Sequence, residues 1–344
     1  MTTPIEWRSA VLQATRDLTP DIRLFEIAPS GEFVAPTPGS HINVTVQIDG
    51  RPDTRSYSTV GPCDDGLYRI AVKLLPDSRG GSSYMWSLKP GARLTVSTPG
   101  NHFELGRGRP EYILLAGGIG ITPIYSMALA LAQAGANFRL LYACRSRQDL
   151  ALADDLAERI GDQLRVFIDE EGAKVDLAAE ISGLAPGGEL YVCGPIGLLE
   201  AAKRQWQQSG RPVDQLRFET FGNSGRFATM PFTVKIPRLG REVEVPQNRT
   251  MLDALEAAGI AMIFDCRRGE CGLCALDIIE TDGIVDHRDV FFSDKQHAEN
   301  RKICACVSRV VGGSISVDPP FRGDGRLTPG AEGSVVRKTA PAAG

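Results

Sequence analysis

The chain has 344 residues, 42% of them hydrophobic, which is enough for two or three domains that each bury an apolar core. It contains 38 lysines and arginines and 42 aspartates and glutamates, which gives a formal net charge of -4. Because there is no basic excess to bind a phosphate backbone, nucleic acid is not an expected partner. The N-terminal segment carries charges throughout and lacks the apolar core of a signal peptide, which favours a cytoplasmic protein.

Residues 1–107 are predicted to form an antiparallel β-barrel. Apolar and polar residues alternate in short runs at 22–27, 42–48, 68–75 and 93–98, as expected of strands with one buried face. Clusters of proline and glycine separate these runs and mark the turns of a small barrel.

Two short motifs in this barrel are suited to a flavin. The first combines an arginine that can fork onto a phosphate, a tyrosine that can lie along an aromatic ring and a serine hydroxyl that can reach a ring nitrogen. The second is a glycine-rich run whose unhindered N–H groups can cradle a phosphate. Either motif alone fits an ordinary barrel surface, whereas both in one barrel favour a bound flavin. The motifs are Arg55, Ser56, Tyr57 and Ser58, and Arg79, Gly80, Gly81 and Ser82.

Residues 108–224 alternate short apolar runs with helical segments, which predicts a parallel sheet with helices on both faces. The stretch 112–138 has no charged residue and is long enough to cross a bilayer. Gly117, Gly118, Gly120 and Pro123 interrupt it after only a few apolar residues, which indicates a buried strand, a tight turn and a helix, so no membrane association is expected. The strands are expected at 113–116, 139–143, 164–168, 189–193 and 215–218, and two of the helices at 150–160 and 198–208.

The turn after the first of these strands is predicted to bind the pyrophosphate of a nucleotide. Its sequence, Gly-Gly-Ile-Gly-Ile-Thr-Pro at 117–123, admits a pyrophosphate close to the helix N-terminus, although it is not the G-x-G-x-x-G fingerprint. Cys193 ends a later strand at the same carboxyl edge of the sheet, where ligands bind in open α/β folds. The alternatives are a tight turn without a ligand and a buried, unreactive cysteine.

The strongest signal is the distribution of the cysteines. Five of the eight lie in a predicted C-terminal domain of residues 231–320. Cys266-x4-Cys271-x2-Cys274 followed at a distance by a further cysteine is the plant-type spacing for a 2Fe-2S cluster, whereas zinc sites usually pair two short knuckles. Cys304 and Cys306 are both candidates for the fourth ligand, because 29 and 31 residues separate them from Cys274 and spacing alone does not choose.

Other parts of this domain carry weaker predictions. Strands at 232–236 and 243–245 are expected to pair across a turn, and Thr250 is expected to cap a helix that ends before Gly259. The segment 286–289, Asp-His-Arg-Asp, is interpreted as an exposed turn with a capping aspartate. Residues 321–344 are rich in glycine, alanine and proline and are predicted to be a disordered tail.

The order of these motifs resembles the phthalate dioxygenase reductase family, within the ferredoxin-NADP reductase superfamily, and vanillate demethylase reductases are similar. The resemblance rests on Arg-x-Tyr-Ser, Gly-Gly-Ile-Gly-Ile-Thr-Pro, Cys-Gly-Pro and the plant-type cysteine loop, and it covers about residues 5–320. It implies an FMN-binding barrel, an NADH-binding α/β domain and a C-terminal β-grasp ferredoxin domain. It also implies the task of passing electrons to a terminal Rieske-type oxygenase.

For the flavin, the resemblance implies that Arg55 holds the phosphate, Tyr57 flanks the isoalloxazine and Ser58 lies near its reactive nitrogen. The run from Arg79 to Ser82 matches the family's phosphate loop, and Phe221 matches the aromatic residue that stacks by the flavin at the domain junction.

For the other cofactors, the resemblance implies that Gly118, Gly120 and Thr122 line the pyridine nucleotide site, with Cys193 near the nicotinamide. Ser58, Cys193 and Phe221 are therefore the expected catalytic residues. The Cys-Val-Ser-Arg context favours Cys306 as the fourth cluster ligand.

The resulting hypothesis is a monomeric oxygenase reductase. NADH gives up two electrons together as hydride and a 2Fe-2S cluster accepts one at a time, whereas a flavin can do both. The alternatives are an NADH reductase for another one-electron acceptor, such as a diiron hydroxylase, and a redox-sensing module. The protein is expected to prefer NADH to NADPH as its electron donor, although Arg145 and Arg147 after the second strand of the sheet could bind a 2'-phosphate.

Overall fold

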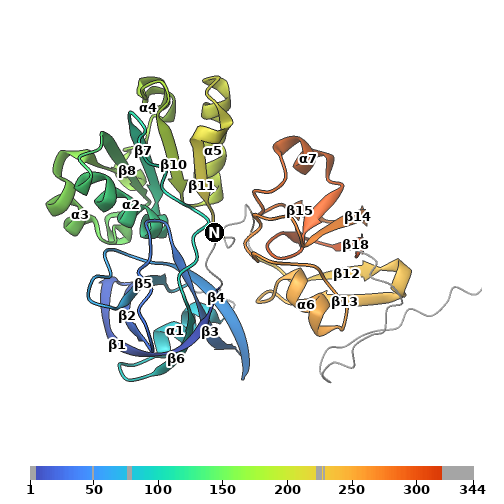
Figure 1. Cartoon of the computed structure of the whole chain (residues 1–344). Coiled ribbons are helices and arrows are strands. Elements are labelled where there is room, and N and C mark those ends of the chain that lie inside the picture. Colours follow the sequence, from blue (N-terminus) through green and yellow to red (C-terminus); the bar gives the residue numbers. More distant parts are fainter. Residues whose placement is uncertain (1–4, 49, 76–79, 222–226, 228, 320–344) are drawn as a thin grey trace, which may run out of the picture. The chain divides into compact units, whose positions relative to one another are not determined.

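A computed structural model describes residues 5–48, 50–75, 80–221, 227 and 229–319 (Figure 1). Predictions for Arg79, for most of the linker at 223–231 and for the tail at 321–344 fall outside the described residues. The chain divides into two compact units, residues 1–219 and 220–344, and each unit is described by itself.

The first sheet of the N-terminal unit is the predicted antiparallel barrel. Its strands lie in the order β4-β3-β6-β1-β2-β5, and a bridge between Thr59 and Ile70 joins the end of β4 to β5. The alternating apolar residues point inward, so that Leu12, Phe25 and Val44 are fully buried. A short helix, α1 (Gly81–Ser87), packs against β3 and β5. The strands are β1 (Trp7–Thr19), β2 (Ile22–Pro29), β3 (His41–Ile48), β4 (Arg51–Ser58), β5 (Tyr68–Lys73) and β6 (Arg93–Ser97).

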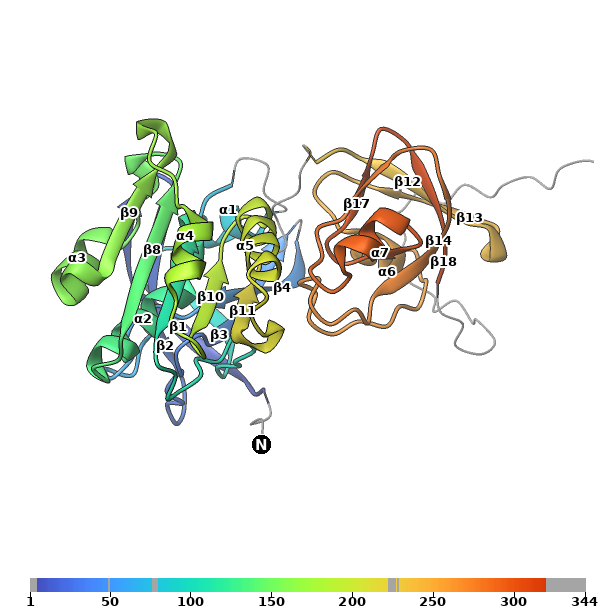
Figure 2. The ribbon, with the colours of Figure 1, turned by 90° about the horizontal axis from the view of Figure 1, so that it is seen from above.

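The second sheet of this unit is parallel, as predicted, with strand order β11-β10-β7-β8-β9. Helices α2 and α3 pack together, as do α4 and α5, and α5 lies along β10 and β11 (Figure 2). The strands are β7 (Tyr112–Gly117), β8 (Phe138–Cys144), β9 (Leu164–Ile168), β10 (Glu189–Cys193) and β11 (Leu216–Glu219). The helices are α2 (Ile121–Gln133), α3 (Ala153–Ile160), α4 (Leu177–Gly183) and α5 (Ile196–Gln208).

The structure tests two predictions about the helices that follow the strands of this sheet. The uncharged stretch divides into β7, a 3-10 turn and α2, and none of the described helices is long and apolar enough to cross a membrane. Helix α3 begins at Ala153 rather than at residue 150, so the predicted start was wrong. Leu150 ends a 3-10 turn over Arg147–Asp149, and Leu152 has a left-handed φ of 62°, which a continuous helix does not accommodate.

The C-terminal unit contains a mixed five-stranded sheet in the order β13-β12-β18-β14-β16 and a two-stranded sheet of β15 and β17. The predicted hairpin is confirmed by the pairing of Val234 with Val243, and Thr250 caps α6 as expected. The elements are β12 (Phe232–Ile236), β13 (Arg241–Val245), α6 (Met251–Ala257), β14 (Ala275–Thr281), β15 (Ile284–Asp286), α7 (Asp294–Glu299), β16 (Lys302–Cys304), β17 (Arg309–Val311) and β18 (Ser314–Asp318).

Candidate functional site

Arg55 and the start of α1 are brought together on the barrel. Strand β4 carries Arg55, whose guanidinium Nη1 lies 2.6 Å from the Asp53 carboxylate. A Cβ placed on Gly81 would lie 2.7 Å from the Arg55 Nε atom, so only glycine allows the arginine to lie against this backbone. Arg55 and the glycine-rich run, predicted separately from the sequence, therefore lie together on the barrel, and the Asp53 carboxylate holds the guanidinium there.

The other residues of the Arg-x-Tyr-Ser motif divide between the two faces of β4. Tyr57 shares the half-buried face with Arg55 and packs against the barrel core, and burial raises the pKa of its hydroxyl. Ser56 lies on the opposite, exposed face, where its hydroxyl donates to the Asn43 side-chain oxygen at 2.6 Å. Ser58 is buried at the end of the strand. The alternation of the strand thus favours Arg55 and Tyr57 over Ser56 as flavin contacts.

The predicted nucleotide turn joins β7 to α2 through a tight 3-10 turn. A Cβ on Gly120 would lie 2.2 Å from the Cys193 carbonyl oxygen, so the turn packs directly on the backbone at the end of β10. A Cβ on Gly118 would meet nothing within 4 Å. Thr122 is buried and its hydroxyl donates to the Ile119 carbonyl oxygen at 3.0 Å. The motif therefore leaves an open position at Gly118 and packs Gly120 on the backbone of fully buried Cys193, at the carboxyl edge of the sheet where ligands bind.

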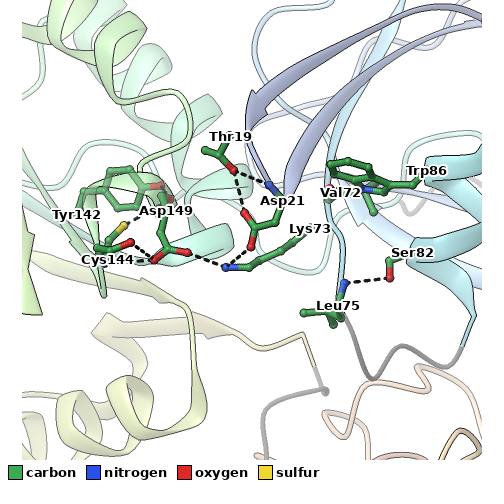
Figure 3. Close-up of polar contacts among 11 residues, drawn as sticks. Thr19, Asp21, Val72, Lys73, Leu75, Ser82, Trp86, Tyr142, Cys144 and Asp149 are labelled. Atoms are coloured by element: carbon green, nitrogen blue, oxygen red, sulfur yellow. Dashed lines mark hydrogen bonds and ion pairs between the residues drawn. The ribbon is translucent and has the colours of Figure 1, made fainter. Parts of the chain in front are cut away.

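The loop after β8 is fixed to the barrel through Lys73 (Figure 3). The Lys73 ammonium lies 2.9 Å from a carboxylate oxygen of Asp149 and 3.1 Å from one of Asp21. The other Asp149 oxygen accepts hydrogen bonds from the Ser146 N–H and hydroxyl at 3.2 and 2.9 Å. Burial raises the pKa of Asp149, but the bonds from Lys73 and Ser146 outweigh it and the pKa is lowered. The Asp149 charge thus links the barrel to the parallel sheet.

Phe221 is half-buried, two residues after β11 ends at Glu219. It is the second residue of the C-terminal unit, and its contact with a flavin stays a prediction.

In the C-terminal unit, the predicted loop wraps around a sulfur atom. The Cys266 Sγ atom accepts hydrogen bonds from the backbone N–H groups of Arg268 and Glu270 at 3.4 and 3.5 Å. All eight cysteines are free thiols in this structure. Backbone donors aimed at a cysteine sulfur are the arrangement that stabilises thiolates bound to iron.

The distant cysteines converge on this loop. Hydrogen bonds from the Cys304 and Cys306 thiols lower the pKa of the Cys274 thiol. The pKa values of the Cys304 and Cys306 thiols are raised, first by their hydrogen bonds to Cys274 and then by burial. Among the smaller effects, the Asp289 carboxylate raises the pKa of Cys304, whereas the Gly269 N–H lowers that of Cys306. This difference in surroundings favours Cys306 as the fourth ligand. A set of converging, partly buried thiols fits a 2Fe-2S cluster, and cluster binding would keep them deprotonated.

The segment 286–289 is not the exposed turn that the sequence predicted. Asp286, Arg288 and Asp289 are 1%, 5% and 1% exposed, because Arg288 pairs with Asp286 at 2.7 Å and Asp289 accepts hydrogen bonds. The Phe292 N–H, the Ser308 hydroxyl and the His297 Nε2 atom lie 3.0, 3.1 and 3.0 Å from the Asp289 carboxylate. The segment therefore supports the loop that carries Cys266, Cys271 and Cys274. Next to the segment, the Val290 N–H donates a hydrogen bond to the Gly269 carbonyl oxygen of this loop.

Sequence models of three families match successive parts of the chain. An oxidoreductase FAD-binding domain matches residues 9–105, an oxidoreductase NAD-binding domain matches residues 114–204, and a 2Fe-2S iron-sulfur cluster binding domain matches residues 234–311. The chain is 36% identical to the phenoxybenzoate dioxygenase subunit beta of Ectopseudomonas oleovorans, over 87% of this chain and 93% of that protein.

Solved structures agree with these matches. The structure of phthalate dioxygenase reductase superposes with a TM-score of 0.72 and 30% identity, over 91% of this chain and 98% of that one. An intact type IV self-sufficient cytochrome P450 monooxygenase superposes with a TM-score of 0.62 and 33% identity over 90% of this chain. Full-length CYP116B46 from Tepidiphilus thermophilus superposes with a TM-score of 0.63 and 34% identity over 91% of this chain. This chain spans 41% and 42% of the length of those two larger proteins.

The three successive domains define an oxidoreductase that contains flavin-binding, NAD-binding and 2Fe-2S modules. The chain belongs to the phthalate dioxygenase reductase family, to which the order of its sequence motifs is similar.

Proposed function

We propose that the protein is the reductase component of a Rieske-type oxygenase system, which takes electrons from NADH and passes them to a terminal oxygenase. The observation that carries this proposal is the joining of a flavin barrel, a nucleotide-binding sheet and a converging set of cysteine thiols in one chain. A flavin supplies the step from two-electron to one-electron chemistry when it is bound.

The residues of the chain then have positioning and electrostatic roles. Arg55 and the backbone at Gly81 bind the flavin phosphate, and Tyr57 lies along the ring system. Gly118 leaves room for the nucleotide pyrophosphate, and buried Cys193 lies at the nicotinamide end of the sheet edge. Cys266, Cys271, Cys274 and Cys306 hold the cluster.

We further propose that the flavin is FMN. The family resemblance supports FMN, and the Arg55 guanidinium, which lies against the backbone at Gly81, can fork onto a phosphate group. Purified protein is expected to contain one flavin, two irons and two acid-labile sulfides per chain. Heat should release FMN, and recovery of FAD, or of zinc without sulfide, would contradict the corresponding assignment.

A haem-containing acceptor is the second candidate, because the cytochrome P450 monooxygenase above contains a segment similar to this chain. The decisive experiment supplies the purified reductase and NADH to the candidate Rieske oxygenase from a neighbouring gene, and in parallel to a bacterial cytochrome P450. Product formation by the Rieske oxygenase that depends on the reductase supports the proposal. Activity with only the P450 would favour the second candidate, and steady reduction of ferricyanide would exclude a purely sensing role.

The protein is further proposed to be a cytoplasmic monomer, in line with its charge and its expected role as a diffusing electron carrier. Analytical ultracentrifugation of the flavin-loaded protein tests the monomeric state.

A further inference from the structure

Two charged loops meet at one point of the parallel sheet's carboxyl edge. The first follows β8 and carries Arg145 and Arg147, and the second follows β9 and carries Glu170 and Glu171. The Glu170 N–H donates to the Arg145 carbonyl oxygen at 3.1 Å, so the backbones of the two loops are joined. Both loops line one hollow, formed by Ser146, Arg147, Gln148, Ile168, Glu170 and Glu171.

Each arginine in these loops is already paired. Arg147 binds Glu171 through two nitrogens, with Nε to Oε1 at 2.5 Å and Nη2 to Oε2 at 2.8 Å. Arg145 Nε lies 3.6 Å from Glu170 Oε1. The side chains of Arg145 and Arg147 are 85% and 72% exposed, so the two ion pairs face solvent rather than the core.

The position of the hollow indicates which part of a nucleotide meets it. In this strand order β7 is the first strand, and the loop after the second strand, β8, is where open α/β folds bind the adenosine ribose. An acidic residue there accepts hydrogen bonds from the ribose hydroxyls of NADH, and a free arginine there binds the 2'-phosphate of NADPH.

We infer that Glu170 and Glu171 are specificity-determining residues that exclude NADPH by pairing with Arg145 and Arg147. This inference rests on the proposed use of NADH. A 2'-phosphate that entered the hollow would meet two arginines whose charge is cancelled by two carboxylates less than 4 Å away, well within a screening length of about 8 Å. The phosphate would also have to displace the bidentate Arg147–Glu171 pair.

The conformation of the loop that carries Arg145 and Arg147 does not depend on the side chains of these glutamates. Asp149 holds it through Ser146 and through Lys73 of the barrel (Figure 3). Replacing both glutamates by glutamine should therefore leave the arginines in place and free their guanidinium groups for a phosphate.

The experiment compares wild type with the double variant Glu170→Gln/Glu171→Gln. Ferricyanide reduction is measured with NADH and with NADPH, and binding of adenosine 2',5'-bisphosphate is titrated by calorimetry. We expect the KM for NADPH to fall and its kcat/KM to rise about tenfold, a change of about 1.4 kcal/mol. The bisphosphate should bind correspondingly more tightly, and the ratio of the NADPH kcat/KM to the NADH kcat/KM should rise.

The matched control is Asp154→Asn/Glu158→Gln, which removes two exposed carboxylates from helix α3. It should leave the kcat/KM values for NADH and NADPH unchanged. Adding Arg147→Gln to the glutamine pair should abolish the gain. If wild type reduces ferricyanide with NADH but the double variant neither uses NADPH better nor binds the bisphosphate more tightly, the inference is wrong and the proposed function stands. If neither nucleotide reduces the wild-type flavin, both are wrong.

Discussion

Gly272 lies between two cysteines of the cluster loop in a left-handed conformation, with φ of +71°. A Cβ at this position would lie 2.3 Å from the ring of Phe291, so the aromatic ring occupies the space that a side chain would need. The left-handed backbone favours glycine here, and any side chain would require the Phe291 ring or the loop to move.

The variant Gly272→Ala should lose most of its iron and acid-labile sulfide, because the ring or the loop must move. Gly312→Ala is the matched control, since its φ is +75° but a Cβ there meets nothing within 4 Å. Both substitutions carry the left-handed penalty of about 1 kcal/mol, so their difference isolates the contact with Phe291. Iron analysis and visible absorbance measure the outcome, and equal cluster content in both variants would contradict the prediction.

The fourth cluster ligand is tested by the two buried cysteines that follow the loop. Cys306→Ser should lose or perturb the cluster spectrum, because the Gly269 N–H of the cluster loop bonds to this thiol and the Cys-Val-Ser-Arg context favours it. Cys304→Ser should retain the spectrum, because Cys304 pairs with Ala275 in the sheet and lies near Asp289. Electron paramagnetic resonance of the reduced proteins gives the readout, and the opposite result would show that the plant-type spacing decides.

At the scale of elements, regular alternation and local motifs made most strands predictable. The period-two runs located β2, β3, β5 and β6, and the glycine turn located β7 and α2. What the sequence could not predict depends on partners distant along the chain. The burial of Asp289 requires Ser308 and His297, and the pairing of Arg147 requires Glu171 from another loop. A charged residue is expected to be exposed until its partner is known, which explains why the burial of Asp289 was missed. The Arg147–Glu171 pair is exposed, and it was missed because its two residues lie in different loops.

The contact of β5 with the loop before α3 should contribute measurably to stability. Lys73→Met is expected to reduce the free energy of unfolding of the N-terminal unit by about 1 kcal/mol at pH 7, since a partly buried pair is lost. The pKa of Asp149 is lowered in the folded chain, so its stabilising contribution is complete above the unfolded value of about 3.9 and is lost as the pH falls below it. The difference between wild type and variant should therefore shrink from pH 7 to about pH 3.

Tryptophan fluorescence during urea unfolding measures this effect, because Trp7, Trp86 and Trp206 all lie in residues 1–219. The control is Lys89→Met, which changes an exposed lysine of the same barrel. A difference between wild type and the Lys73 variant that does not depend on pH would show that Asp149 is not the charge that Lys73 stabilises.

At the scale of the whole molecule, the division into two units separates the cofactors. Residues 1–219 contain the described parts of the proposed flavin and nucleotide sites except Phe221, and residues 220–344 contain the five clustered cysteines. Each unit buries its own apolar residues, so each is expected to fold without the other. This arrangement allows the two stages of electron transfer to be tested apart.

A chain that ends at Asn223 should bind flavin and reduce ferricyanide with NADH at a rate close to that of the full chain, because ferricyanide can take electrons from the flavin directly. It keeps Arg55, Tyr57, Cys193 and Phe221 and lacks every proposed cluster ligand. The same chain should fail to support the terminal oxygenase, which must receive electrons from the cluster. The full-length variant Cys274→Ser is the matched control, since it keeps the C-terminal unit but removes a ligand. If the shortened chain, shown to contain flavin, drove the oxygenase at the full-length rate, the cluster would not lie on the electron path and the C-terminal unit would serve docking instead.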